Sequence, residues 1–398
     1  MQWSSRAMLR LLIVNILDRE EKIMAEWLKT ALIDIVELIG GGTPKTSKAE
    51  YWDGNINWLS VKDFNNENRY VYSTEKTITE EGLNNSSTKL LKKDDIIISA
   101  RGTVGELAMI PFPMAFNQSC YGIRAKEGID SIFLYYLIKN SVRKFKAITH
   151  GSVFDTITRD TFANIEVAIP DIKTQHRIAK MLADIDDKVE NNQRINNNLE
   201  QQVSVLYQSW FEDFEITNGI CPENWSYQEL STIADIASGK RPPVKSDTCN
   251  EKTPISIVGA ASVMGFTSEA NHIDKILVTG RVGTHGVIQR LNTPCWTSDN
   301  TLVIKSPYYE FTNQILHRID YSSMNRGSTQ PLITQGDMKK VVVLVPDEDT
   351  LAKFEEFAGS LMAKWETNNN ENVKLASLRD TLLPKLMSGE LDVSGIDL

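Results

Sequence analysis

The sequence has few of the residues from which metal and redox centres are usually built. It contains 5 histidines and 4 cysteines in 398 residues, and Cys120, Cys221, Cys249 and Cys295 lie far apart, without a Cys-x-x-Cys pair. This spacing excludes the usual zinc-binding patterns and indicates no disulfide framework, so a reducing cytoplasm is the expected location.

Motifs of common catalysts are missing too. We find no G-x-x-x-x-G-K-[ST] phosphate loop, no G-x-G-x-x-G fingerprint and no N-P-P or D-P-P methyltransferase motif. Asp171, Asp186 and Lys188 mimic the carboxylate–lysine pattern of a nuclease, but we expect Asp186 and Lys188 on a helix, whereas that chemistry needs a strand. We therefore predict no catalytic residue, no metal site and no cofactor in this chain.

Long apolar runs are also lacking. The run at residues 8–17 is interrupted by Arg10 and is too short to span a bilayer. Charged residues follow it where a signal peptide would have a small-residue cleavage site, so we interpret residues 1–23 as an N-terminal extension. No membrane partner is expected.

Basic residues are fewer than acidic ones: the chain has 43 Lys and Arg but 52 Asp and Glu, which gives a net charge of -9. Nucleic-acid-binding domains usually carry a basic surplus, although a local basic stripe is enough for phosphate contacts. With 41% hydrophobic and 24% charged residues, the composition is typical of a folded protein of two or three domains.

What the chain does have is an internal repeat. Residues 151–171 and 327–347 align without a gap and are identical at seven of 21 positions. The same offset of 176 residues aligns Asn192 with Asn368 and Asn196 with Asn372 in the segments that follow. A weaker match relates residues 95–110 to 274–289, with Val104-Gly105 aligned on Val282-Gly283. The chain is therefore predicted to be two copies of one plan, each a globular domain followed by a long segment.

The predicted fold class is α/β (α+β), with two mixed α/β domains and two long antiparallel coiled-coil helices in a pseudo-twofold repeat. Short apolar runs bounded by Gly, Pro and charged residues predict strands at 96–100, 165–169, 276–279 and 341–345, and a helix at 132–146. The expected organisation is an extension (1–23), a first domain (24–171), a central helix (172–215), a second domain (216–346) and a C-terminal helix with a tail (347–398).

Both long segments have apolar or seam residues at alternating steps of four and three, as in a coiled-coil heptad. The seam positions are Ile185, Val189, Asn192, Asn196, Leu199, Val203, Leu206 and Trp210 in the first, and Leu361, Trp365, Asn368, Asn372, Leu375, Arg379, Leu382 and Leu386 in the second. Antiparallel pairing would bring the four asparagines together, and buried asparagines at such positions set the helix register at some cost in stability. The alternative is a locally polar, solvated stretch.

Three segments carry a resemblance to a known family, the specificity subunits of type I restriction–modification systems. Residues 41–64 (GGTPKTSKAEYWDGNINWLSVKDF) resemble the opening of a target-recognition domain, and residues 169–189 resemble the central helix, with Pro170, Gln175 and Ile178 near the pattern P-x-x-x-Q-x-x-I. The ending LRDTLLPKLMSGELDV (378–393) is the most specific match. The resemblance covers about residues 24–398. The second copy has Leu351 in place of Gln175, and SGKRPPVKS (238–246) is its nearest counterpart of GGTPKT.

The resemblance implies a non-catalytic subunit in which each domain reads one half of a split, asymmetric site in double-stranded DNA. The helices would set the gap and dock two methyltransferase (M) subunits, and restriction (R) subunits would join through the complex. S-adenosylmethionine, ATP and Mg would belong to those partners. The alternative is a coiled-coil scaffold that joins two protein-binding domains.

The candidate DNA-binding residues come from polar and basic loops between the predicted strands, since such loops place Arg and Lys on phosphates and Arg, Asn, Gln or Ser on base edges. In the first domain they are Thr43, Lys45, Lys48, Lys62, Arg101, Thr103, Asn117, Gln118, Ser119, Gly151 and Ser152. In the second they are Lys240, Arg241, Lys245, Arg281, His285, Ser298, Asn300, Arg326, Ser328 and Gln330. Arg101 and Arg281 are expected in matching loops. For each residue, the alternative is an ordinary solvated side chain.

Overall fold

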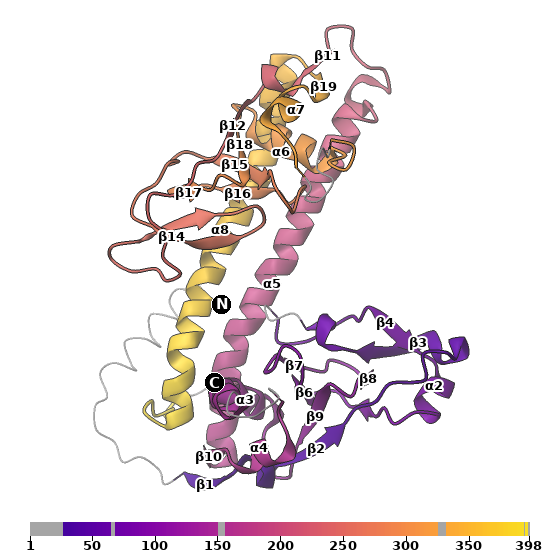
Figure 1. The fold of residues 1–398 in the computed structure, drawn as a ribbon, viewed down its shortest axis with the longest axis vertical. Coiled ribbons are helices and arrows are strands. Elements are labelled where there is room, and N and C mark those ends of the chain that lie inside the picture. The colour runs from indigo at the N-terminus through magenta and orange to yellow at the C-terminus, as the bar shows by residue number, and fades with distance from the viewer. Residues whose placement is uncertain (1–26, 65–67, 150–155, 325–331, 394, 397–398) are drawn as a thin grey trace. The chain divides into compact units, whose positions relative to one another are not determined.

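The computed structural model describes residues 27–64, 68–149, 156–324, 332–393 and 395–396 (Figure 1). They divide into two compact units: unit 1 holds the described residues up to Gln193 and from Asn369 onward, and unit 2 holds Arg194–Asn368. The extension expected at residues 1–23 lies outside the described residues. In the part of the chain that is described, no helix is long and apolar enough to cross a membrane.

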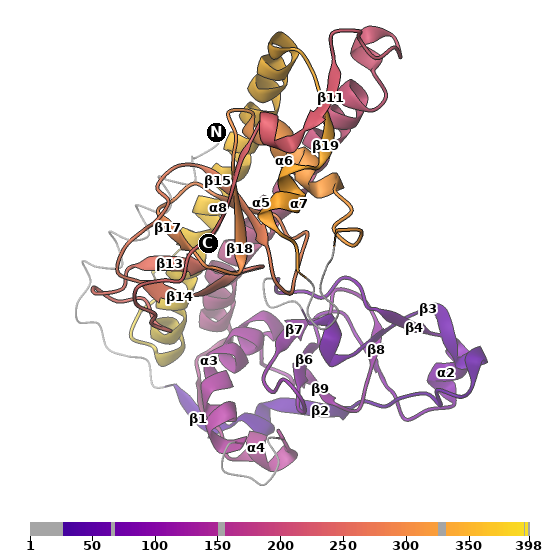
Figure 2. The same cartoon turned by 45° about the horizontal axis from the view of Figure 1, so that its top comes forward.

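Unit 1 contains two four-stranded sheets and a two-stranded ribbon. The first sheet has the order β2-β9-β6-β7 and is antiparallel throughout (Figure 2), and the second has the order β4-β3-β8-β5 with β3 and β8 parallel. β1 pairs with β10 to form the ribbon. The bounds are β1 Leu28–Ala31, β2 Val36–Gly40, β3 Trp52–Leu59, β4 Lys76–Ile78, β5 Leu90–Leu91, β6 Ile96–Ser99, β7 Leu107–Met109, β8 Met114–Phe116, β9 Cys120–Ala125, β10 Glu166–Ile169, α2 Glu80–Asn84, α3 Ser131–Thr149 and α4 Arg159–Ala163.

Unit 2 has the same plan in a second set of strands. Its antiparallel sheet has the order β12-β18-β15-β16, its smaller sheet the order β14-β13-β17 with β13 and β17 parallel, and β11 pairs with β19. The bounds are β11 Ser226–Glu229, β12 Asp235–Ser238, β13 Ile255–Val258, β14 Val263–Thr267, β15 Ile276–Gly280, β16 Gln289–Leu291, β17 Cys295–Thr297, β18 Thr301–Lys305, β19 Val342–Val345, α6 Tyr309–Arg318 and α7 Gln335–Lys339. The predicted strands at 96–100, 165–169, 276–279 and 341–345 are confirmed as β6, β10, β15 and β19, and the helix predicted at 132–146 as α3.

The hairpin that follows β6 and β15 corrects one part of the sequence alignment. Ser99 pairs with Cys120 in unit 1 and Gly280 pairs with Thr301 in unit 2, which are equivalent positions at an offset of 181 residues. The offset aligns Gly102 with Gly283 and Gly105 with Gly286, and all four have positive φ, at 81°, 83°, 89° and 76°. The alignment of Val104-Gly105 on Val282-Gly283 was therefore wrong by three residues, because the turns require glycine at both left-handed positions.

Two long helices, α5 (Ile172–Phe211) and α8 (Glu348–Ser388), each contribute residues to both units. Each begins at an aspartate that accepts backbone N–H bonds of the first turn: Asp171 from Lys173 and Thr174, and Asp347 from Thr350. Such caps satisfy donors that the helix itself leaves unpaired. Within each unit the two helices run antiparallel. Residues with higher numbers on α5 contact residues with lower numbers on α8, as in Asp186–Arg379 and Asn192–Asn372 of unit 1.

The hydrophobic core of each unit joins the antiparallel sheet to the helices. In unit 1, Ile98 of β6 and Phe133 of α3 belong to one buried cluster with Leu182 of α5 and Leu386 of α8. In unit 2, Leu277, Phe311, Val203 and Phe354 belong to the corresponding cluster. All four residues of β6 are buried, which explains why the strand is a continuous apolar run and not an alternating pattern.

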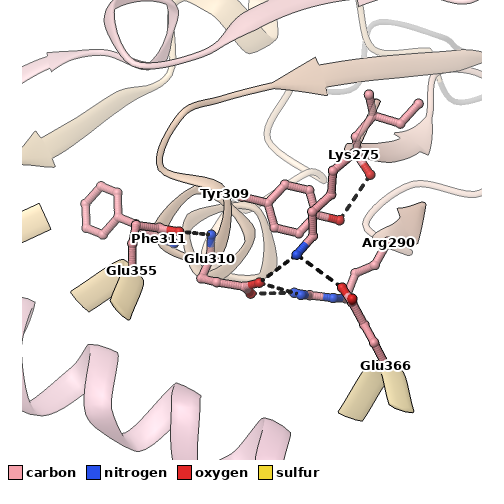
Figure 3. A network of polar contacts seen from close by, with 8 residues as sticks. Lys275, Arg290, Tyr309, Glu310, Phe311, Glu355 and Glu366 are labelled. Carbon is pink, nitrogen blue, oxygen red and sulfur yellow. Dashed lines mark hydrogen bonds and ion pairs between the residues drawn. The ribbon is translucent and has the colours of Figure 1, made fainter. Parts of the chain in front are cut away.

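A polar network in unit 2 joins β15, β16 and α6 to α8 (Figure 3). Arg290 donates to both carboxylate oxygens of the buried Glu310 at 2.7 Å, and Lys275 lies 3.1 Å from a carboxylate oxygen of Glu366. The carboxylate of Glu355 accepts the backbone N–H bonds of Glu310 and Phe311, at 3.1 and 2.8 Å, at the start of α6. Burial raises the pKa of Glu355 to about 7, while these two N–H donors act in the opposite direction.

This pKa predicts that Glu355 makes stability depend on pH. Its pKa is above that of an unfolded glutamate, so the folded state binds the proton more tightly, and the resulting stabilisation is lost as pH rises from about 4.5 to about 7. In urea unfolding, the unfolding free energy of the parent minus that of Glu355→Gln should fall as pH rises from about 4.5 to about 7. The matched control is Glu356→Gln on the exposed face of α8. A difference that rises with pH for Glu355→Gln would contradict the assignment.

Candidate functional site

In unit 1, three loops that are far apart in sequence meet beyond the ends of β2, β6 and β8. The N–H of Gly42 donates to the carbonyl of Phe116 at 3.0 Å, and the N–H of Ala100 donates to the carbonyl of Ser119 at 2.8 Å. The Thr43 hydroxyl is hydrogen-bonded to the side-chain oxygen of Gln118. The predicted residues at 43–48, 101–103 and 117–119 therefore belong to one group of loops.

Unit 2 holds its loops with the same backbone bonds. The N–H of Lys240 donates to the carbonyl of Thr297 at 2.9 Å, and that of Arg281 donates to the carbonyl of Asn300 at 2.8 Å. Arg101 and Arg281 thus lie in matching loops, but Arg281 takes the place of Ala100, one position before the equivalent of Arg101.

One glycine in each unit permits this junction. A Cβ on Gly41 would lie 2.1 Å from the carbonyl oxygen of Asn117, and a Cβ on Gly239 would lie 2.1 Å from that of Ser298. No real Cβ approaches an oxygen so closely, so both positions require glycine. The SGKRPPVKS segment is therefore the structural counterpart of GGTPKT.

Two tryptophans that the sequence reasoning missed support the same loops. Trp58 Nε1 donates to the carbonyl of Gly42 at 3.0 Å, and Trp296 Nε1 donates to the carbonyl of Lys240 at 2.7 Å. Trp58 belongs to β3 and Trp296 to β17, which are not equivalent strands. No constant spacing links them to the loops, so the sequence held no signal for this contact.

Most of the candidate DNA-binding residues that the structure describes reach the surface. Lys48 and Lys62 are also in ion pairs, with Glu50 at 2.9 Å and Glu75 at 3.8 Å. The exposed candidates are Lys45, Lys48, Lys62, Arg101, Thr103, Gln118, Lys240, Arg241, Lys245 and Asn300, and the partly buried ones are Thr43, Asn117, Ser119, Arg281 and His285. Gly151, Ser152, Arg326, Ser328 and Gln330 lie outside the described residues.

Ser298 and His285 face their own unit more than solvent. Ser298 is only 1% exposed, and its N–H donates to the carbonyl of Val258 at 3.0 Å. His285 Nδ1 lies 3.1 Å from the carbonyl oxygen of Gly280, so in the neutral ring the proton is on Nδ1. Ser298 therefore supports the turn, and the exposed polar residues that follow it are Asp299 and Asn300.

The four helix asparagines form two pairs, one in each unit. In unit 1, Asn192 donates to Asn372 at 2.8 Å and to Glu371 at 2.9 Å. In unit 2, Asn368 donates to Asn196 at 2.8 Å. Asn192, Asn196 and Asn368 are each less than 5% exposed, so these three are not solvated side chains. Their role in setting the register remains a prediction.

Gln175, the glutamine of the family pattern, is 1% exposed and bonds only to backbone in the contacts described. Its Nε2 donates to the carbonyls of Gly128 and Pro170 at 3.2 and 3.0 Å, and its Oε1 accepts the N–H of Asp130 at 2.9 Å. It therefore joins the first turn of α5 to the loop before α3. In unit 2 the buried Leu351 takes its place and contributes apolar packing.

In the described ranges, His, Cys, Asp and Glu form no cluster that could hold a metal ion. The four cysteines are free, and burial raises the pKa of Cys120 to about 12, which keeps this thiol protonated at neutral pH. The polar loops are thus the surface on which a functional assignment rests.

Known proteins share this architecture. Residues 24–201 match the family model of the type I restriction modification DNA specificity domain. The type I restriction enzyme MjaIX specificity subunit of Methanocaldococcus jannaschii is 28% identical, over 94% of this chain and 95% of its own. The EcoR124I/EcoR124II specificity subunit of Escherichia coli is 33% identical over 40% of this chain and 41% of its own.

A solved structure has the same fold. The S subunit of a type I restriction-modification system from M. genitalium has a TM-score of 0.59 at 18% identity, and the match covers 93% of this chain and 98% of that one. The resemblance of the chain to type I specificity subunits, predicted from its sequence, is confirmed.

The close approach at Gly239 predicts that one added methyl group lowers the stability of unit 2 markedly. Gly239→Ala should destabilise unit 2 by about 1–3 kcal/mol, because the turn at Ser298 must move away. Gly359→Ala is the control: it lies inside α8 with no atom within 4 Å of the added Cβ, and should stabilise the protein by up to about 1 kcal/mol. Thermal unfolding of both variants measures this, and equal melting temperatures would disprove the constraint.

Proposed function

We propose that the chain is the non-catalytic subunit that selects the DNA sequence for a type I restriction–modification complex. Each unit presents one loop group, and each group would read one half of a split, asymmetric site. The observation that carries the proposal is the shared loop junction: two units with different side chains hold their polar loops by the same backbone bonds and the same required glycine.

The chemistry of the loops suits duplex DNA. Lys45 and Arg101 in unit 1, and Lys240 and Arg241 in unit 2, are exposed cations that can neutralise phosphates. Gln118 and Asn300 are exposed amides beside them, and amides can recognise base edges through paired hydrogen bonds. Because these loops are locally basic, the acidic total charge does not oppose binding.

The long helices would dock two methyltransferase subunits. Trp210 of α5 and Phe357 of α8 make an edge-to-face contact with ring centroids 6.0 Å apart, and Phe357 is 57% exposed. Exposed aromatic side chains are enriched at protein interfaces. S-adenosylmethionine would be used by these methyltransferase subunits, and ATP and Mg by the restriction subunits that complete the complex.

The direct test is adenine-methylation mapping of host DNA, with and without this gene, in cells that keep the partner methyltransferase. Loss of methylation at one split motif when the gene is removed would support the proposal and reveal both half-sites and their gap. Unchanged methylation beside an active partner would overturn it and favour the scaffold alternative.

Arg101→Ala and Arg241→Ala should each affect one half-site only. The variants should relax the base preference, or weaken methylation, in the half read by their own unit, because each loop group is built within one unit. Where the side chain contacts phosphate, the slope of log affinity against log salt should fall by about 1. Lys93→Ala removes an exposed cation from the turn before β6, at the strand end opposite Arg101, and serves as the control. Equal effects on both halves would contradict the assignment.

Phe357→Ser should weaken assembly with the methyltransferase subunit by about tenfold or more, because it removes an exposed aromatic side chain from the proposed interface. Co-purification and titration of the two subunits measure this. Ile273→Ser is the matched control, because Ile273 is an apolar residue of unit 2 outside the helices and is more exposed than Phe357, at 72% against 57%. Similar losses for both variants would show that the effect is not specific to the helix surface.

A further inference from the structure

Unit 1 contains a chain of polar contacts that none of the functions above requires, in which Arg69, Tyr136 and Asp186 are buried and Asp187 is exposed. Arg69 is 6% exposed, and its Nη2 donates to Asp187 of α5 at 2.6 Å while its Nη1 lies 3.4 Å from the hydroxyl of Tyr136 of α3. Tyr136 donates to Asp186 Oδ2 at 2.6 Å, and Arg379 of α8 donates to Asp186 Oδ1 at 2.8 Å. We call these five residues the Asp186 network.

The network joins the antiparallel sheet of unit 1 to α3 and to both long helices. The backbone of Arg69 is bound to the edge strand of the antiparallel sheet, because its carbonyl accepts the N–H of Met109 in β7 at 2.8 Å. From this edge the contacts pass to α3 and then to both long helices. Asp186 is the branch point, since its two oxygens accept from different elements.

Stability alone is a poor explanation for this arrangement. Buried charges and hydroxyls add little to the free energy of folding compared with apolar packing, even when they are fully paired. They do differ from apolar packing in geometry, because each bond tolerates only a narrow range of distance and angle. Burial also raises the pKa of Tyr136 above its usual value, so its hydroxyl keeps the proton that it donates to Asp186.

The repeat shows that this network is not a general feature of the fold. Asp186 and Asp187 are matched by Met362 and Ala363 in the second copy. Unit 2 is connected to α8 through different residues: Lys275, just before β15, pairs with Glu366, and Glu355 accepts two N–H bonds from the start of α6 (Figure 3). Each unit thus has its own polar connection to the long helices.

We propose that the Asp186 network is a positioning device, which holds the first recognition domain at one angle on the helices of its own unit and thereby makes the complex intolerant of altered half-site spacing. The inference rests on the proposed function. One base pair added to the gap moves a half-site by about 3.4 Å and turns it by about 35° around the duplex. A domain held rigidly does not follow that displacement, whereas a loosened domain does.

The experiment uses reporter DNA that carries the mapped motif with its native gap and with the gap one base pair shorter or longer. The full complex is assembled with the parent chain, Tyr136→Phe or Asp186→Asn, and the methylation rates at altered and native gaps are compared as a ratio. Both variants should raise this ratio about tenfold while methylation at the native gap stays within about twofold. Tyr136→Phe keeps the buried ring and removes only the hydroxyl, so it decides the question even if Asp186→Asn folds poorly.

The control is Asp95→Asn, which breaks a buried ion pair inside the same domain. Asp95 accepts from Arg124 at 2.9 and 2.6 Å, and neither residue belongs to the long helices. A general loss of stability would change the ratio for this variant as well, and the proposal requires that it does not. A ratio within about twofold of the parent for Tyr136→Phe would overturn the positioning role. Absence of methylation by the parent complex at any motif would instead count against the proposed function.

Discussion

The two loop groups depend on one close contact between backbone atoms. At Gly41 and at Gly239, a loop passes so near the carbonyl oxygen of the neighbouring turn that no side chain fits between them. Because this contact joins the loop after β2 or β12 to the turn before β9 or β18, it brings segments that are distant in sequence to one surface. The side chains that project from that surface can vary, since backbone atoms alone make the contact between the loops.

The two units show which features a common fold requires. Strand order, the turn glycines and the loop junction recur, whereas the buried charges do not. Asp186 is matched by Met362, and Gln175 by Leu351, yet each unit closes its core against both helices. Apolar strands and backbone hydrogen bonds therefore define the topology, and polar side chains refine the geometry within it.

Regular features could be predicted from the sequence, and features made by contacts over long distances could not. Apolar runs predicted β6, β10, β15 and β19, because periodicity is a local property. The hairpin alignment failed by three residues, because identical Val-Gly pairs outweighed the two left-handed positions that only Gly102/Gly105 and Gly283/Gly286 can occupy. Ser298 was grouped with exposed residues because its burial depends on a strand 40 positions earlier, at Val258.

The path of the chain makes unit 2 an insertion within unit 1. The chain leaves unit 1 after Gln193 and returns to it at Asn369. The residues near these two points contact one another in each unit, through the hydrogen bonds Asn192–Asn372 and Asn196–Asn368. A unit whose two ends already touch can be excised, closed by a short linker or exchanged for another without stretching the remaining chain. The architecture therefore allows unit 2 to be replaced as a whole while unit 1 is kept.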